Sequence, residues 1–229
     1  MVKNHLMRLA APKTWKIERK KTAFVTRPRP GAHAFQVGMP INLILKEVLA
    51  LVSTSKETKH LLNEKKVLVN GKIVHDPRKL VGFMDILSIS ALDKHYRVSL
   101  STKDYLTFVP ISDTKNRVLR IKSKNTDKKN KQTLHLQDGS TMRSDLKCKV
   151  GDSVLLDEKN SIKELIPLKE GSIVMLTGGF HIGNIGKVKS FLNRGSVVLA
   201  EVESEGEIFT TKKEFAFVLG KDKPLVQVI

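Results

Sequence analysis

The first part of the pattern of apolar positions predicts two helices. Residues 41–52, INLILKEVLALV, repeat apolar side chains at helical spacing directly after Pro40, a residue that suits the first helical position. The stripe consists of Ile41, Leu45, Val48, Leu49 and Val52. Thr54 and Glu57 then fit a capping box, so we expect a second short helix that ends near Asn63.

Short strands follow the helices. VLVNGKIV, residues 67–74, pairs two β-prone runs across Asn70-Gly71, which is the strongest two-residue hairpin signal. Residues 82–90 are predicted as a further strand, in which Asp85 is either exposed or bound to a turn. Two helices and a small hairpin sheet within residues 41–92 make one compact unit.

From residue 93 onward the pattern is β throughout. Asp138-Gly139 marks a second hairpin, and the lysine-rich segment SKNTDKKNKQ before it is either a solvated loop or an RNA contact. Short strands within residues 169–229 predict a small antiparallel barrel. The candidate strands before the barrel are 96–100, 105–111, 117–122, 132–137, 140–143 and 153–156.

The fold class is therefore α+β and β-rich. We expect four parts along the chain: an N-terminal extension, a helix-helix-hairpin domain, a central β domain and a C-terminal β-barrel. Their bounds are 1–40, 41–92, 93–168 and 169–229.

The distribution of charge along the chain predicts a polyanionic partner. Residues 1–40, called the arm below, hold nine Lys or Arg against one acid, Glu18, a net +8 out of the chain's total of +18. The arm has no sustained apolar period, so we expect that it cannot bury enough surface to offset the entropy of its own ordering. A polyanion would relieve its repulsion, and nucleic acid is the obvious one.

Several other classes of protein fit the sequence poorly. There is no run of about eighteen apolar residues for a membrane span, and the N-terminus carries charges where a signal peptide is apolar. A mitochondrial presequence is a minor alternative for the arm. The single cysteine, Cys148, excludes an internal disulfide and fits a reducing cytoplasm, and we interpret it as a small structural residue. We expect a cytoplasmic protein without a membrane partner.

No catalytic pattern emerges from the sequence. The loop TGGFHIGNIGKV fails the Walker spacing because Val188 follows Gly186-Lys187, and it fails the dinucleotide fingerprint as well. The histidines are scattered without ligand spacing, so we expect no metal, no cofactor and no small-molecule substrate. The sequence indicates a protein that is not an enzyme.

Four collinear segments resemble one known family, the S4e family of archaeal and eukaryotic small-subunit ribosomal proteins. They are NHLMRLAAPKTW, VNGKIVHDPRKLVGFMDILSI, MLTGGFHIGNIGKV and FAFVLGKDKPLVQV. The resemblance implies that residues 41–92 are an S4-type RNA-binding domain and that residues 171–207 contain a KOW motif centred on Gly186, within an SH3-like barrel. The chain ends at PLVQVI without the basic C-terminal extension of eukaryotic members, so an archaeal-type version is expected.

The resemblance also implies a function. A structural constituent of the small ribosomal subunit would bind small-subunit ribosomal RNA (rRNA) and neighbouring ribosomal proteins, with the arm lying against RNA. For Trp15, stacking on a base and docking onto its own or a neighbouring protein remain equal alternatives. The predicted RNA-binding residues are Lys3, His5, Arg8, Lys13, Trp15, Lys16, Arg19, Lys20, Lys21, Arg27, Arg29, Lys46, Lys56, Lys59, Lys66, Lys72, Lys187, Lys189 and Arg194.

Two competing functions remain to be distinguished. An RNA-modifying enzyme could carry an S4-type module, but it would need a sizeable catalytic domain that the middle of the chain does not suggest. A KOW-type factor could visit the ribosome or a polymerase transiently. Such a factor would dissociate at moderate salt and would have less need of so long an arm.

Overall fold

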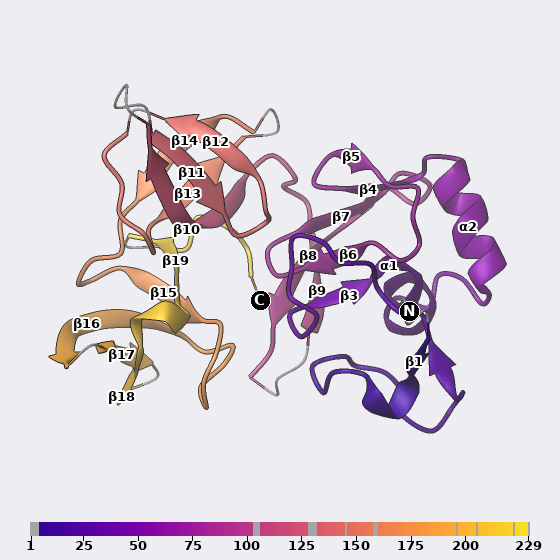
Figure 1. Ribbon diagram of the computed structural model, residues 1–229, viewed down its shortest axis with the longest axis horizontal. Helices are drawn as coiled ribbons and strands as arrows, with labels where there is room; N and C mark the ends of the chain where they lie inside the picture. The colour runs from indigo at the N-terminus through magenta and orange to yellow at the C-terminus, as the bar shows by residue number, and fades with distance from the viewer. Residues whose placement is uncertain are drawn as a thin grey trace. The chain divides into compact units, whose positions relative to one another are not determined.

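The computed structural model describes residues 5–102, 106–127, 132–144, 146–157, 160–195, 197–204, 206–221 and 223–228. The chain forms two compact units (Figure 1): the first comprises Met1–Ser99 with Asp104–Thr114, and the second Leu100–Lys103 with Lys115–Ile229. Within the described ranges, no helix has the length and apolar character needed to cross a membrane. The architecture is β-rich with few helices, as the sequence predicts.

The first unit is built on a five-stranded antiparallel sheet in the order β5-β4-β7-β8-β9. Two small ribbons, β1 with β2 and β3 with β6, lie outside this sheet. The boundary expected between residues 92 and 93 separates β7 from β8, which are hydrogen-bonded neighbours in this sheet. The strands are β1 (Leu6–Met7), β2 (Phe24–Val25), β3 (Gly38–Pro40), β4 (Val67–Val69), β5 (Lys72–Ile73), β6 (Leu80–Gly82), β7 (Ile86–Ile89), β8 (Lys94–Leu100) and β9 (Leu106–Ile111).

The first predicted helix is present but shorter and wider than its pattern indicates. One turn of α-helix, α1 (Ile41–Leu43), continues as a π-helical turn, η2 (Ile44–Val48). Leu43, Ile44 and Leu45 are all buried, so the apolar surface wraps around the helix instead of forming one stripe. Helical periodicity carries no signal for a π turn, which is a rare local widening often found at functional sites.

The second helix, α2 (Ser55–Asn63), confirms the predicted bounds and its capping box. The Thr54 Oγ1 accepts a hydrogen bond from the Glu57 amide at 3.3 Å. The Glu57 carboxylate reaches back to the Ser53 amide at 2.8 Å, one residue before the cap. The hydrogen bond from the Ser53 amide, together with one from the Thr54 hydroxyl at 2.8 Å, holds the pKa of the Glu57 carboxylate below its ordinary value.

The Asn70-Gly71 hairpin is confirmed. Both residues have positive φ, 54° and 75°, as a type I′ turn requires, and Val69 pairs with Lys72 across it. The turn also binds Asp85, since the side-chain Nδ2 of Asn70 donates a hydrogen bond to Asp85 Oδ1 at 2.7 Å. Of the two alternatives for Asp85, the turn-binding one is correct: the side chain is only 3% exposed.

Asp85 also holds the arm to the sheet. Its Oδ2 accepts hydrogen bonds from the Gly82 amide at 2.9 Å and from His33 Nε2 of the arm at 2.8 Å. Burial by itself would raise the pKa of Asp85, but the interactions with His33, with support from Gly82 and Asn70, hold it below its ordinary value. A Cβ added at Gly82 would lie 2.2 Å from the His33 ring, so only glycine lets the imidazole reach this place.

This network predicts a loss of stability in acid. A carboxylate whose native pKa is lowered stabilises the fold above its unfolded pKa of about 3.9, and that contribution disappears as the pH falls through the native value. Asp85→Asn should therefore lower the free energy of unfolding by about 1–3 kcal/mol near pH 6, and by less near pH 3.

Chemical unfolding followed by the fluorescence of Trp15, the single tryptophan, measures this difference. Asp93→Asn is the matched control, because Asp93 is exposed and its positive φ of 48° suits asparagine. An equal effect of Asp85→Asn at both pH values would contradict the prediction.

The second unit contains two five-stranded antiparallel sheets. The first has the order β12-β11-β10-β13-β14 and the second β18-β17-β16-β15-β19. Residues 128–131, the tip of the lysine-rich segment, lie outside the described residues, so its RNA contact stays a prediction. The elements are β10 (Arg117–Thr126), β11 (Gln132–Leu136), β12 (Thr141–Ser144), β13 (Ser153–Leu156), β14 (Ile162–Ile166), β15 (Ile173–Leu176), β16 (Ile185–Arg194), β17 (Val197–Ser204), β18 (Glu207–Lys212), η3 (Lys213–Phe215) and β19 (Ala216–Gly220).

Strand β19 joins the two sheets of this unit. It pairs with β15 in one sheet, it contacts β10, β13 and β14 of the other, and all five of its residues are buried. The sequence predicts a central β domain (93–168) and a separate C-terminal barrel (169–229). In the structure, strands from both of these ranges pack against β19. In the second sheet β18 and β19 lie at opposite ends of the order, and the closed barrel stays a proposal.

Two glycine positions of this unit have clear physical reasons. The Asp138-Gly139 hairpin has a three-residue loop closed by a hydrogen bond from the Leu136 amide to the Ser140 carbonyl, with Gly139 at φ 76°. At Gly186 on β16, a Cβ would lie 2.5 Å from the Glu203 carbonyl oxygen of β17. Strands β16 and β17 can approach this closely only with glycine at that position.

Candidate nucleic-acid interface

The arm is packed against its own unit, contrary to the expectation that it cannot order itself. Trp15 is 1% exposed, its Nε1 donates a hydrogen bond to the Gly38 carbonyl at 2.8 Å, and its ring lies 5.3 Å from that of Phe35. Of the alternatives for Trp15, the structure therefore supports docking onto its own protein. A single large side chain anchors the irregular segment, and such an anchor has no periodicity for a sequence pattern to reveal.

Arg8 is a second anchor and is buried as well. Its guanidinium forms a two-pronged ion pair with Glu47 of η2, with N–O distances of 2.7 and 2.8 Å. Further hydrogen bonds go to the Thr22 hydroxyl and to the carbonyls of Thr22 and Glu18. The hydrogen bonds to Glu47 raise the pKa of Arg8. Arg8 is thus committed within the protein, and in this conformation neither it nor Trp15 is available to RNA.

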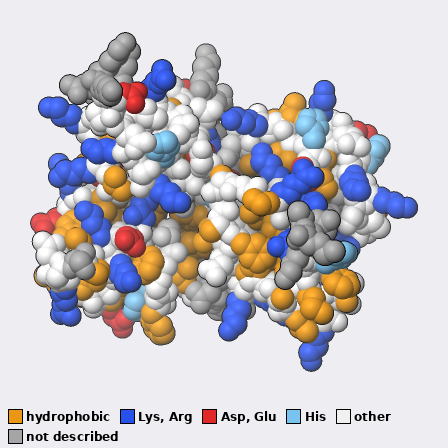
Figure 2. Space-filling model, viewed as in Figure 1, with side chains coloured by type: hydrophobic (Ala, Val, Ile, Leu, Met, Phe, Trp, Pro, Cys, Tyr) orange, Lys and Arg blue, Asp and Glu red, His pale blue; other side chains and the backbone are white. Residues whose placement is uncertain are grey.

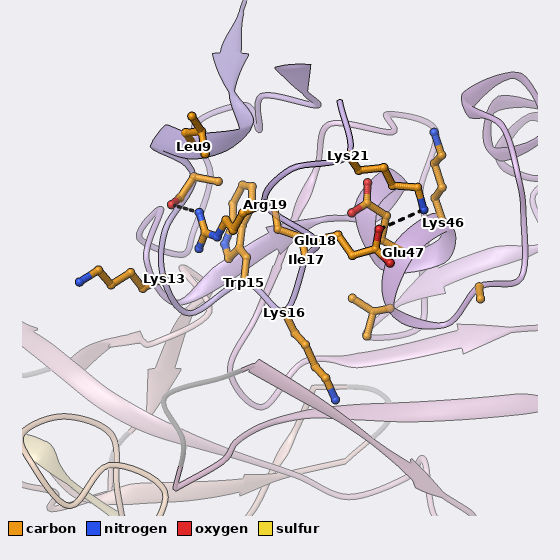
Figure 3. A pocket seen from close by; sticks show the side chains of 13 residues that line it. Leu9, Lys13, Trp15, Lys16, Ile17, Glu18, Arg19, Lys21, Lys46 and Glu47 are labelled. Atoms are coloured by element: carbon orange, nitrogen blue, oxygen red, sulfur yellow. Dashed lines mark hydrogen bonds and ion pairs between the residues drawn. The ribbon is translucent and has the colours of Figure 1, made fainter. Parts of the chain in front are cut away.

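Between the arm and the end of η2 lies a hollow of about 1180 Å³ (Figure 3). Residues 9–21 form one wall and residues 46–50 the other. Arg19 belongs to the first wall, where its guanidinium is held by the carbonyls of Ala11 at 2.7 Å and Pro12 at 2.6 Å. These partners are neutral, so they fix the position of the guanidinium and leave its charge uncompensated.

Lysines surround this hollow. In Figure 3 the side chains of Lys13, Lys16 and Lys46 extend outward from the lining in three different directions, and their ammonium groups mark what is called its rim below. Among the described residues these lysines have no ion-pair partner. Lys21 lies 3.7 Å from Glu18, and both of these side chains are largely exposed. Glu47, the other acid of the lining, is neutralised by Arg8. The hollow is therefore positively charged.

The other predicted arm residues have mixed surroundings. His5 is exposed and its ring lies 5.6 Å from that of Phe24, while Lys20 is exposed. Arg27 is half-buried, and Arg29 pairs with Asp76 at 3.0 Å. Lys3 lies outside the described residues. Arg78, which the sequence analysis does not select, ties this segment down through a 3.0 Å hydrogen bond to the Arg27 carbonyl.

The predicted lysines of the helix-hairpin segment lie mostly at the surface. Lys56 and Lys59 are exposed on α2, and Lys72 is exposed on β5. Lys66 pairs with Glu64 at 2.6 Å, so its charge is already partly compensated. These residues do not line the hollow. Figure 2 likewise shows Lys and Arg side chains spread over the visible face instead of gathered in one patch.

In the last segment, Lys187, Lys189 and Arg194 are all exposed on β16. Lys187 lies opposite Glu203 of β17, in keeping with the small net charge of this segment. Phe180 is not among the predicted residues, yet it is 95% exposed in the glycine loop beside His181. Only its unusual position between glycines and a histidine could have marked it.

The arm and the hollow beside it are typical of one class of protein. The described parts of the chain contain no group of His, Cys, Asp or Glu side chains that could hold a metal ion. They present a basic arm locked onto a small helical unit, followed by β sheets. A basic surface on a fixed frame is typical of structural proteins that associate with nucleic acid.

Comparison with known proteins gives the family. Residues 92–161 match the family model described as ribosomal family S4e, and residues 2–36 match the model of the RS4NT (NUC023) domain. A small ribosomal subunit protein eS4 from Methanocella arvoryzae is 39% identical, over 99% of this chain and 98% of that protein. One from Methanospirillum hungatei is 34% identical, over 97% and 96%. The chain belongs to the ribosomal S4e family, and it is a ribosomal protein and not an enzyme.

A solved structure supports the same assignment. The crystal structure of the 30S ribosomal protein S4e from Thermoplasma acidophilum matches with a TM-score of 0.69 and 27% identity, covering 81% of this chain and 95% of that one. The resemblance seen in the sequence segments is thereby confirmed, including the archaeal character of the relatives.

Proposed function

We propose that this protein is a structural component of the small ribosomal subunit that binds and stabilises small-subunit rRNA. The observation that carries the proposal is the positively charged hollow, built by an arm that is locked to the helical unit through Arg8 and Trp15. Lysines on a fixed frame neutralise phosphates at less entropic cost than lysines on a free chain.

The four parts expected from the sequence belong to this proposal. Residues 41–92 would act as the S4-type RNA-binding domain, residues 93–168 as a central β domain, and residues 169–229 as a KOW-containing SH3-like barrel. The strand order with β19 beside β15, and the close approach that requires Gly186, support the barrel assignment. Neighbouring ribosomal proteins are the expected further partners.

Sucrose-gradient sedimentation of cell extract, with quantitative mass spectrometry of each fraction, tests this function. We expect about one copy per small subunit, retained through a high-salt wash. A transient factor would instead be substoichiometric and would be removed by salt. Absence from the small-subunit peak would refute the proposal.

A further inference from the structure

The hollow is lined by two kinds of side chain, apolar and cationic, and its ligand should contact both. Its lining includes the apolar side chains of Ile17, Val48 and Ala50, and that of Leu9, which is 77% exposed; these four are called the apolar floor below. Its rim carries the lysines described above. A phosphate backbone alone would use the rim and leave the apolar floor in contact with water, whereas an apolar ligand would leave the cations unused.

An unpaired nucleotide has both parts. We infer that the hollow holds one unpaired nucleotide of the bound RNA, with its base against the apolar floor and its flanking phosphates on the lysines of the rim. This inference rests on the proposed function and names the RNA feature that the site takes. Proteins commonly recognise RNA through splayed bases that stack on side chains and guanidinium planes.

The dimensions and the fixed groups agree with this ligand. The volume, about 1180 Å³, exceeds the roughly 300–1,000 Å³ of a pocket for a drug-sized molecule, which leaves room for a base, its ribose and adjacent phosphates. Arg19 is held in place by three backbone carbonyls, so its guanidinium needs little reorganisation to meet a base or a phosphate. Glu47 would repel a phosphate, but Arg8 neutralises it.

The experiment separates base from phosphate. The purified full-length protein is titrated with a decamer of uridylate and with the same decamer lacking its bases, at several salt concentrations. We expect the wild type to bind the complete decamer about tenfold more tightly, the gain typical of a stacked base, with equal salt slopes for both RNAs. Equal affinities for the two decamers would overturn the inference.

Variants assign the effect to the hollow. Ile17→Ser should reduce the preference for bases to near unity without changing the salt slope. Lys13→Ala with Lys16→Ala should weaken both RNAs equally and reduce the slope by up to about 0.7 for each lost phosphate contact. Phe24→Ser is the matched control, because Phe24 is an arm residue that is 55% exposed and lies outside the lining. A base preference unaffected by Ile17→Ser would place the base elsewhere and overturn the assignment.

Two further results keep the inference distinct from the proposed function. If the protein binds transcribed small-subunit rRNA but shows no preference between the two decamers, the inference alone is overturned. If it binds neither the rRNA nor the decamers more tightly than a neutral protein does, the proposed function is contradicted. An acidic leucine-containing peptide that binds the hollow more tightly than the uridylate decamer would show a protein partner in place of the nucleotide.

Discussion

Glu47→Ala is expected to destabilise the first unit by about 3–5 kcal/mol, the cost typical of leaving a buried charge without its partner. The Arg8 side chain is 3% exposed and that of Glu47 is 8% exposed, so water cannot replace the lost carboxylate without opening the arm. The carbonyls and the hydroxyl that also bind Arg8 are neutral and cannot compensate its charge.

Chemical unfolding followed by Trp15 fluorescence measures this loss. A double variant, Arg8→Met with Glu47→Leu, should recover most of the stability, because two apolar side chains need no mutual charge compensation. Glu18→Ala is the control: its ion pair with Lys21 is exposed and 3.7 Å long, so it should contribute at most about 1 kcal/mol. A loss from Glu47→Ala no larger than that of the control would show that the buried pair does not hold the arm.

Trp15→Ala is expected to cost about 3–5 kcal/mol and to release the arm from the helical unit. The indole is almost completely buried, and its removal leaves a cavity and the Gly38 carbonyl without its donor. Because the arm is rich in lysine and arginine, its release should expose trypsin sites that are protected in the wild type.

The rate of tryptic cleavage within residues 8–29 measures this release under native conditions. Trp15→Phe should give an intermediate rate, since it keeps much of the packing but loses the N–H donor. Phe180→Ala should match the wild type, because Phe180 is 95% exposed and outside the first unit. A cleavage rate in Trp15→Ala equal to that of the wild type would mean that another contact anchors the arm.

Local patterns in the sequence were sufficient for most of the fold. The capping box at Thr54 and the turn at Asn70-Gly71 are decided by residues within a few positions of each other, and both are confirmed. Most strands of the second half were also predicted closely, because alternation and turn residues are local signals, but β14 (Ile162–Ile166) was not predicted. The π turn at Ile44–Val48 was not predictable, since its cause is burial on several sides at once.

The candidate site was only partly predictable. Net charge and residue type identified the basic arm, and Lys13, Lys16 and Lys46 line the hollow, while their contact with RNA stays a prediction. Arg8 was selected for the same reason, yet it binds a carboxylate 39 positions away along the chain. Composition cannot distinguish an arginine that meets phosphate from one that is already paired.

By itself the sequence determined the β-rich class, the helix and hairpin positions, the basic character of the arm and the membership in the S4e family. Each of these depends on local spacing, total charge or collinear motifs. Only the tertiary structure decided that the arm is docked through Trp15, Arg8 and His33, and that its Lys13 and Lys16 line a hollow. The physical reason is that these contacts join residues far apart in the chain, and their partners become known only when the chain is folded.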